Sequence, residues 1–131
     1  MIKSKFLIVS KDISLDAFTK TLSLFTLVEN LNTEQVPFII PKLMATTFIE
    51  RTDLSKEEHP MIKIILKNNT TILQEKEQEV DFKWKLGHKR INGFNNIKIE
   101  EFGELIFSLE YNGEEINRWT ITINQVQTQT E

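Results

Sequence analysis

The feature that most constrains the fold is a stretch near the end of the chain, FGELIFSLEYNGEEINRWTITI, at residues 102–123. Apolar and polar residues alternate in both of its halves, which is the pattern of extended strands with one buried face. The apolar face carries Leu105, Phe107, Leu109 and Tyr111, followed by Trp119, Ile121 and Ile123. Between the halves stands Asn112-Gly113, a pair that readily adopts the positive φ angles of a two-residue turn. The sequence therefore predicts a β-hairpin.

The same two-residue period recurs along most of the chain. It predicts strands at residues 5–10, 22–28, 41–51, 62–67, 80–85 and 96–100. The strand at 22–28 is apolar on both sides, and the alternation in the strand at 80–85 places Trp84 on the core face. Residues 16–20 and 53–58 each have room for one helical turn. Strands joined by short polar links predict a β-sandwich or a barrel.

Length and composition set further limits. The chain has 131 residues, of which 40% are hydrophobic and 27% charged, so we expect one domain at residues 1–124 followed by a polar tail at 125–131. The absence of cysteine excludes thiol chemistry and disulfides. A net charge of −3 argues against a dedicated nucleic-acid binder. The apolar run at residues 6–9 is too short for a secretion signal or a membrane span, so we expect a cytoplasmic protein.

Three stretches of the sequence, taken together, resemble those of a known protein family. They are LSLFTLVENL at 22–31, VPFIIPKL at 36–43 with FIER at 48–51, and FGE at 102–104. In this order they resemble a family of small uncharacterised bacterial proteins, catalogued as a domain of unknown function. The resemblance implies an antiparallel, immunoglobulin-like β-sandwich of about seven or eight strands. It assigns no activity and carries over no catalytic residue, and Thr26 stands where such sequences often have Asn.

The residue types that support catalysis or metal binding form no recognised motif. The two histidines, His59 and His88, are far apart in the sequence, and the cluster of Glu57 and Glu58 beside His59 reads best as a solvated loop. No serine lies in a nucleophile turn, and the four glycines lie too far apart for a phosphate-binding loop. Paired glutamates read as solvated faces. We therefore expect no catalytic site, no metal site and no cofactor.

One stretch concentrates basic residues, and we take it as the candidate contact surface. It consists of Lys85, His88, Lys89 and Arg90, in an expected loop. With Trp84 beside it, binding of single-stranded nucleic acid is conceivable, because cations contact phosphates and rings stack on bases. The predicted core position of Trp84 makes nucleic acid a less favoured partner than an anionic or acidic one.

Two functions remain open. The first is a non-enzymatic interaction or structural module that binds another protein or a second copy of itself. Ile65 and Ile106 support it, because each places an isoleucine on the polar face of its strand, as an exposed patch or beneath a neighbouring subunit. The second is a small-molecule or carbohydrate binder, conceivably an enzyme, with a pocket between the sheets or among the loops.

Overall fold

A computed structural model describes residues 2–52 and 59–127, and within these ranges it contains nine strands and no helix. The strands are β1 (Ile2–Leu15), β2 (Leu22–Leu27), β3 (Asn30–Thr33), β4 (Phe38–Arg51), β5 (Met61–Asn68), β6 (Thr71–Glu79), β7 (Gly87–Ile99), β8 (Gly103–Tyr111) and β9 (Glu114–Gln125). Since the described residues form no helix, none of them forms a helix that could cross a membrane.

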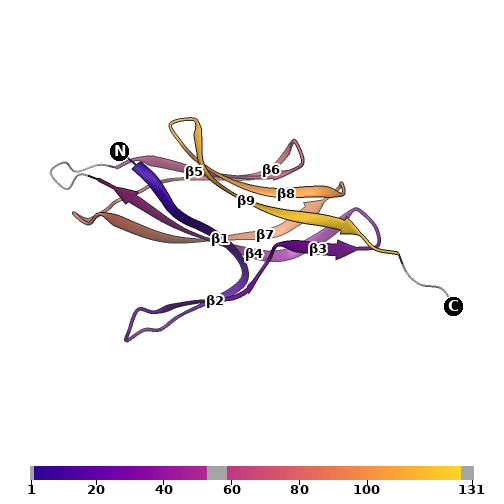
Figure 1. The fold of residues 1–131 in the computed structure, drawn as a ribbon, viewed down its shortest axis with the longest axis horizontal. Helices are drawn as coiled ribbons and strands as arrows, with labels where there is room; N and C mark the ends of the chain where they lie inside the picture. Colours follow the sequence, from indigo (N-terminus) through magenta and orange to yellow (C-terminus); the bar gives the residue numbers. More distant parts are fainter. Residues whose placement is uncertain (1, 53–58, 128–131) are drawn as a thin grey trace.

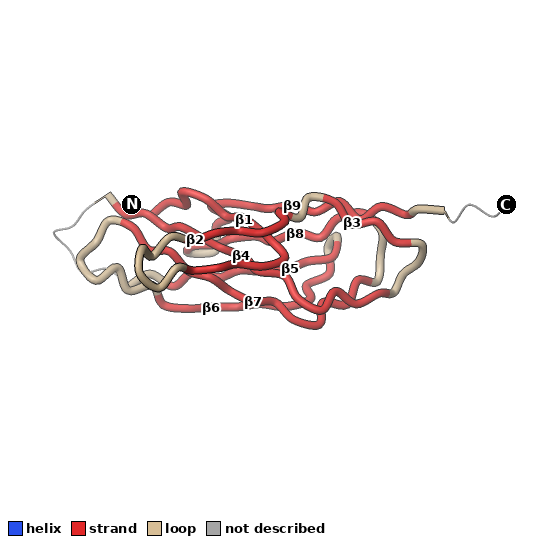
Figure 2. Tube along the Cα trace, turned by 90° about the horizontal axis from the view of Figure 1, so that it is seen from below, coloured by secondary structure: helices blue, strands red, loops and turns tan. Residues whose placement is uncertain are grey.

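The strands form two sheets that face each other (Figures 1 and 2). One sheet has four strands in the order β2-β1-β4-β7, and the other has five in the order β3-β9-β8-β5-β6. This arrangement confirms the predicted all-β sandwich, with nine strands in place of about seven or eight. The pairing is antiparallel, as predicted, except between the edge strand β3 and β9, which run parallel.

The core lies between the sheets and is built from the faces that alternation predicts. Leu105, Phe107 and Leu109 of β8 are fully buried against β4 and β7 side chains, and the Phe94 and Phe107 rings pack edge to face with centroids 5.2 Å apart. One wall is made by the antiparallel pair β4–β7, where Leu43 lies opposite Phe94. Side chains from both sheets therefore close the interior.

The closing hairpin is confirmed as β8 and β9. Asn112 and Gly113 form its turn with φ angles of 53° and 77°. Trp119 is partly buried, and its indole Nε1–H donates a hydrogen bond of 2.7 Å to the carbonyl oxygen of Val28. This bond ties the hairpin to the segment that leads from β2 into β3.

Asn68, at the end of β5, anchors the link between β7 and β8. Its side-chain oxygen accepts hydrogen bonds of 3.0 Å from the backbone N–H groups of Glu100 and Glu101. Its amide nitrogen donates bonds of 3.2 Å to the carbonyl oxygens of Glu101 and Glu104. The residue is 2% exposed, so a buried amide here replaces the water that these backbone groups would otherwise bind.

The predicted strand at residues 80–85 is wrong. Val80 and Phe82 are buried as expected, but Trp84 is 60% exposed. The Asp81 carboxylate accepts a hydrogen bond from the backbone N–H of Lys83, and both Lys83 and Trp84 have positive φ. This turn breaks the alternation after Phe82, so Trp84 leaves the core face.

Other boundaries also differ from the sequence prediction. Neither β6 nor the first half of β7 was expected, because neither has clear alternation of apolar residues. Residues 16–20 form the turn between β1 and β2 instead of a helical turn, and the Asp16 carboxylate accepts bonds from the N–H groups of Phe18 and Thr19. The predicted helical turn at 53–58 lies outside the described residues.

Candidate interaction surface

The predicted basic surface does not form one patch. Lys85 lies in the turn before β7, and His88, Lys89 and Arg90 lie in β7 itself, so they are not in a loop. Register places Lys89 opposite Phe48, whereas His88 and Arg90 lie opposite Ile49 and Thr47. Since neighbouring residues of a strand point to opposite faces, the cations are divided between the outside of the sandwich and its inner edge.

His88 is held in a partly buried site between the sheets. Its ring meets the Phe82 ring edge to face with centroids 6.4 Å apart, and its Nε2 atom is buried without a hydrogen-bond partner. Burial, reinforced by the nearby charge of Arg90, lowers the pKa of the imidazole, while Asp81 opposes the shift. The neutral form is therefore favoured, and His88 contributes little to a basic surface at neutral pH.

Lys85 serves the fold through its backbone. Its carbonyl oxygen accepts a 2.8 Å hydrogen bond from Nε of Arg51, a residue that is 3% exposed at the end of β4. The Arg51 guanidinium also lies 4.8 Å from the centroid of the Phe82 ring. These contacts fasten the 80–86 turn against β4. Histidine, cysteine, aspartate and glutamate form no cluster that could hold a metal among the described residues.

Ile65 and Ile106 do not form an exposed patch. They are 6% and 7% exposed, although they lie on the outer face of the five-stranded sheet. Long charged residues occupy the neighbouring positions, as Lys67 does opposite Ile106. On the same face Arg118 and Glu115 are joined at 2.9 Å, and the Ser108 hydroxyl donates to the Glu115 carboxylate. This bonding lowers the pKa of Glu115, mainly through Arg118.

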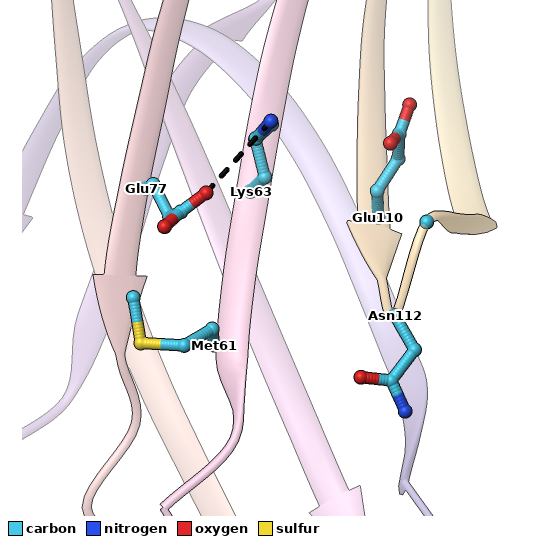
Figure 3. A pocket seen from close by; sticks show the side chains of 6 residues that line it. Met61, Lys63, Glu77, Glu110 and Asn112 are labelled. Carbon is cyan, nitrogen blue, oxygen red and sulfur yellow. Dashed lines mark ion pairs between the residues drawn. The ribbon is translucent and has the colours of Figure 1, made fainter.

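Three of the surface depressions are lined by described residues. One, of 190 Å³, lies beside the β8–β9 turn, and the Lys63–Glu77 ion pair at 3.8 Å lines one side of it (Figure 3). A second, of 410 Å³, lies around Lys67, Glu104 and Arg118. The third, of 430 Å³, is mainly apolar. Its walls are Lys11, Leu31 and residues 38–43.

The largest exposed apolar side chains gather in the hairpin formed by β1 and β2. Ten such side chains occur in the described chain, and four of them lie between residues 15 and 27. They are Leu15 at 56% exposure, Phe18 at 97%, Phe25 at 51% and Leu27 at 49%. We call these four residues the β1–β2 surface. The turn that carries Phe18 stands apart from the other strands (Figure 1), so no other element covers it.

Phe25 and Leu27 of this surface lie on β2, an edge strand that carries no charge. Residues 21–28 contain no Lys, Arg, Asp or Glu, and β2 pairs only with β1. The other three sheet edges are protected in known ways: β3 has four residues, β6 has four charged residues in nine, and β7 has three cations in thirteen. Only β2 therefore offers an edge that is both apolar and uncharged among the described strands.

The apolar character continues from β2 across the outer face of the four-stranded sheet. Register places Leu27 opposite Ser10, Ser10 opposite Met44, and Met44 opposite Gly93. The neighbouring rows hold Ile8, Thr46 and Ile91, then Phe6, Phe48 and Lys89. Lys89 is the one charged residue in these three rows. The sequence indicates this surface in part, because residues 22–28 are apolar on both sides of the strand. Alternation does not tell which of the two sides the rest of the chain covers.

Comparison with models of protein families assigns the chain to one family. The model of the DUF6941 family, a family of unknown function, matches residues 5–124. The chain belongs to this family. The match includes all of the stretches whose resemblance to an uncharacterised family the sequence suggested, and it contains β2 to β8 entirely. No curated protein matches the chain.

Solved structures show a distant likeness. A crystal structure of beta-glucosidase from Listeria innocua in complex with glucose matches with a TM-score of 0.48 and 11% identity, over 97% of this chain and 16% of that chain. The complex of the same enzyme with isofagomine gives 0.46 and 12%, over 95% and 17%. The chain thus spans about a sixth of the length of these enzymes, and at such scores the likeness carries no inference about activity.

Proposed function

We propose that this member of the DUF6941 family is a non-enzymatic protein-interaction module that docks through the β1–β2 surface. The observation that carries the proposal is the exposure of Phe18, Phe25 and Leu27 on a hairpin whose edge strand, β2, carries no charge. Phe25 and Leu27 share one face of β2, Phe18 lies in the turn, and Leu15 adds an exposed side chain on the other face. Large apolar side chains in a contiguous exposed group are typical of surfaces that another protein covers.

The free energy of burying apolar side chains favours a partner bound to the β1–β2 hairpin. Complete burial of a Phe or Leu side chain contributes roughly 1.5–3 kcal/mol before the entropy of association is subtracted. Phe18 buries almost none of its surface within the chain and Phe25 buries about half, so nearly all of this contribution from Phe18 and about half of it from Phe25 is available to a partner. An unpaired strand edge adds backbone hydrogen bonds, which is the usual way a sheet receives an additional strand.

The contacts of the polar side chains among the described residues support a non-enzymatic role. Their polar contacts are structural: Asn68 binds backbone groups, Glu115 pairs with Arg118, and Arg51 holds the carbonyl oxygen of Lys85. His88 has Phe82 against its ring, with no nucleophile hydrogen-bonded to it. These contacts fit a scaffold better than an acid–base site.

Binding of a small molecule or carbohydrate has less support. The mainly apolar depression offers Phe38 as its one aromatic side chain, with Lys11 and Lys42 as its cations. It is open to solvent and lacks the converging polar groups that orient a small ligand.

A photocrosslinking experiment tests the docking surface. A photoreactive phenylalanine analogue replaces Phe18 or Phe25 in the full chain, and the matched control carries it at Ile72, which is 53% exposed on the edge strand β6. Irradiation in the native cytosol is expected to give discrete protein adducts at positions 18 and 25, identified by mass, and none at 72. Equal or absent adducts at all three positions would remove the proposal.

A further inference from the structure

We propose that the partner of the β1–β2 surface is a second copy of this chain, bound through antiparallel pairing of β2 with its counterpart. The inference rests on the docking function proposed above and names its partner. The two four-stranded sheets would join into one sheet across a two-fold axis, in the order β7-β4-β1-β2 followed by the same strands reversed. Closed two-fold dimers are the commonest assemblies of identical chains.

Charge singles out β2 for pairing with itself. A two-fold axis pairs an edge with its own reversed copy, so an edge rich in one sign of charge brings like charges together and repels itself. Self-pairing of β6 would bring Glu75, Glu77 and Glu79 together, and self-pairing of β7 would do so for Lys89 and Arg90. Residues 21–28 contribute no such repulsion.

The faces of β2 also match under this symmetry. Phe25 and Leu27 lie on one face, opposite Asp12 and Ser10 of β1. A two-fold axis perpendicular to the sheet keeps each face on its own side. All apolar side chains of this face would therefore stay on one side of the joined sheet. With the axis beside Phe25, the two Phe25 side chains would lie side by side, and apolar pairs of this kind stabilise neighbouring strands.

The exposed area is of the size that a weak dimer needs. Phe18, Phe25 and Leu27 expose roughly 380 Å² per copy, taking about 200 Å² for a whole phenylalanine, and Leu15 is left out because it lies on the other face of β1. Two copies would thus cover at most about 760 Å² of apolar surface, and with the strand backbone the total stays below about 1,200 Å², where weak and transient interfaces lie. We expect a micromolar dissociation constant.

The backbone limits the register of pairing. Thr26 has a φ of 57°, which interrupts the extended backbone near the end of β2. Regular pairing then centres on residues 22–25. Because paired residues share a face, the axis passes beside a residue that faces its own copy, and the candidates are Ser23, Leu24 and Phe25.

Single-cysteine variants test this geometry, because the chain has no cysteine of its own. Residues facing each other across an antiparallel pair are about 4.5–5.5 Å apart at Cα, within the range of about 4.4–6.8 Å that a disulfide bridges. Ser23→Cys, Leu24→Cys and Phe25→Cys are each oxidised under mild conditions. We expect fast disulfide dimers at one of these positions and at least about 10-fold slower formation in Ile72→Cys, the β6 control.

Sedimentation of the full chain completes the test. Phe25→Lys is expected to weaken dimerisation at least about 10-fold, because it removes an apolar side chain from the paired edge and places a charge on each copy of that edge, while Ile72→Lys leaves it unchanged. Circular dichroism checks that both variants fold. A wild-type chain that stays monomeric at high concentration and forms no preferred disulfide overturns the second-copy proposal. If positions 18 and 25 then still crosslink to a different protein, the docking function stands; if they crosslink to nothing, both proposals fall.

Discussion

Two hairpins of this chain both contain alternating apolar residues, but one buries them and the other exposes them. The β8–β9 hairpin buries its apolar side chains between the sheets, with Leu105, Phe107 and Ile121 fully enclosed. The β1–β2 hairpin leaves Phe18 and Phe25 in solvent at 97% and 51% exposure. The difference lies in position, because β8 is a central strand and β2 is an edge.

The comparison separates residues that hold the fold from residues that are available to a partner. A pattern of alternation reports only that a strand has an apolar side. Whether another element of the chain covers that side depends on topology. The same kind of residue therefore stabilises the monomer in one hairpin and, in our account, the dimer in the other.

The largest contrast is expected from removing one ring in each hairpin. Phe107→Ala leaves a cavity against Phe94 and is expected to lower the free energy of unfolding by about 3–5 kcal/mol. Phe25→Ala is expected to change the stability of the monomer by less than about 1 kcal/mol, because half of the ring is already in water. Urea unfolding at concentrations well below dimer formation measures both values, and similar losses would break the comparison.

The next largest contrast in stability is expected between two polar side chains, Asn68 beside the start of β8 and Asp16 in the β1–β2 turn. Asn68→Ala removes the acceptor for two N–H groups beside the start of β8 and is expected to lower the free energy of unfolding by about 2–4 kcal/mol. Asp16 accepts bonds of the same kind from Phe18 and Thr19 in the exposed β1–β2 turn, and these bonds lower its pKa. Asp16→Ala should cost much less, since water replaces the carboxylate there. Denaturant unfolding of both variants decides the point, and a larger loss for Asp16→Ala would contradict it.

The two turns should respond to glycine in opposite directions. Gly113 has a φ of 77°, so Gly113→Ala is expected to destabilise the fold by about 1–2 kcal/mol. Lys20 has a φ of 60° in the β1–β2 turn, so Lys20→Gly relieves backbone strain there and should be neutral or slightly stabilising. Thermal unfolding followed by circular dichroism compares the pair. A stabilising Gly113→Ala would show that the turn tolerates a Cβ atom.

The smallest expected effect depends on pH. The lowered pKa of Glu115, caused first by Arg118, means that the carboxylate stabilises the fold above its unfolded pKa of about 4.5 and loses this contribution as pH falls through its folded pKa. Because Arg118 and Glu115 are 50% and 34% exposed, the contribution is about 0.5 kcal/mol. The stability difference between wild type and Glu115→Gln should be present at neutral pH and fade as the pH falls below about 4.5 and through the lowered pKa of Glu115. A difference that persists in acid would assign it to another cause.

The fold was largely predictable from the sequence, and the candidate surface was not. Alternation and Asn112-Gly113 identified the closing hairpin, because both signals are local. Trp84 was misplaced because the Asp81 turn, a local feature as well, ends the alternation after Phe82. Ile65 and Ile106 were misjudged because the residues that surround them come from other strands.

The predicted contact surface of Lys85, His88, Lys89 and Arg90 also shows that closeness in sequence does not determine which side chains share a face. These residues are close in sequence, yet β7 places Lys89 on the outer face of the sheet and His88 and Arg90 on the other face, where His88 is partly buried and Arg90 remains exposed. Their placement depends on the pairing of β7 with β4, which composition does not encode. The apolar character of residues 22–28 was visible in the sequence, but only the sheet order shows that β2 is an edge.

Amide hydrogen exchange as a function of protein concentration tests the central claim most directly. The account predicts that the amides of residues 22–25 in β2 become more protected as concentration rises through the dissociation constant, while the amides of the opposing edge strand β6 do not change. Protection that is identical for β2 at low and high concentration would contradict the pairing of this edge with a second copy.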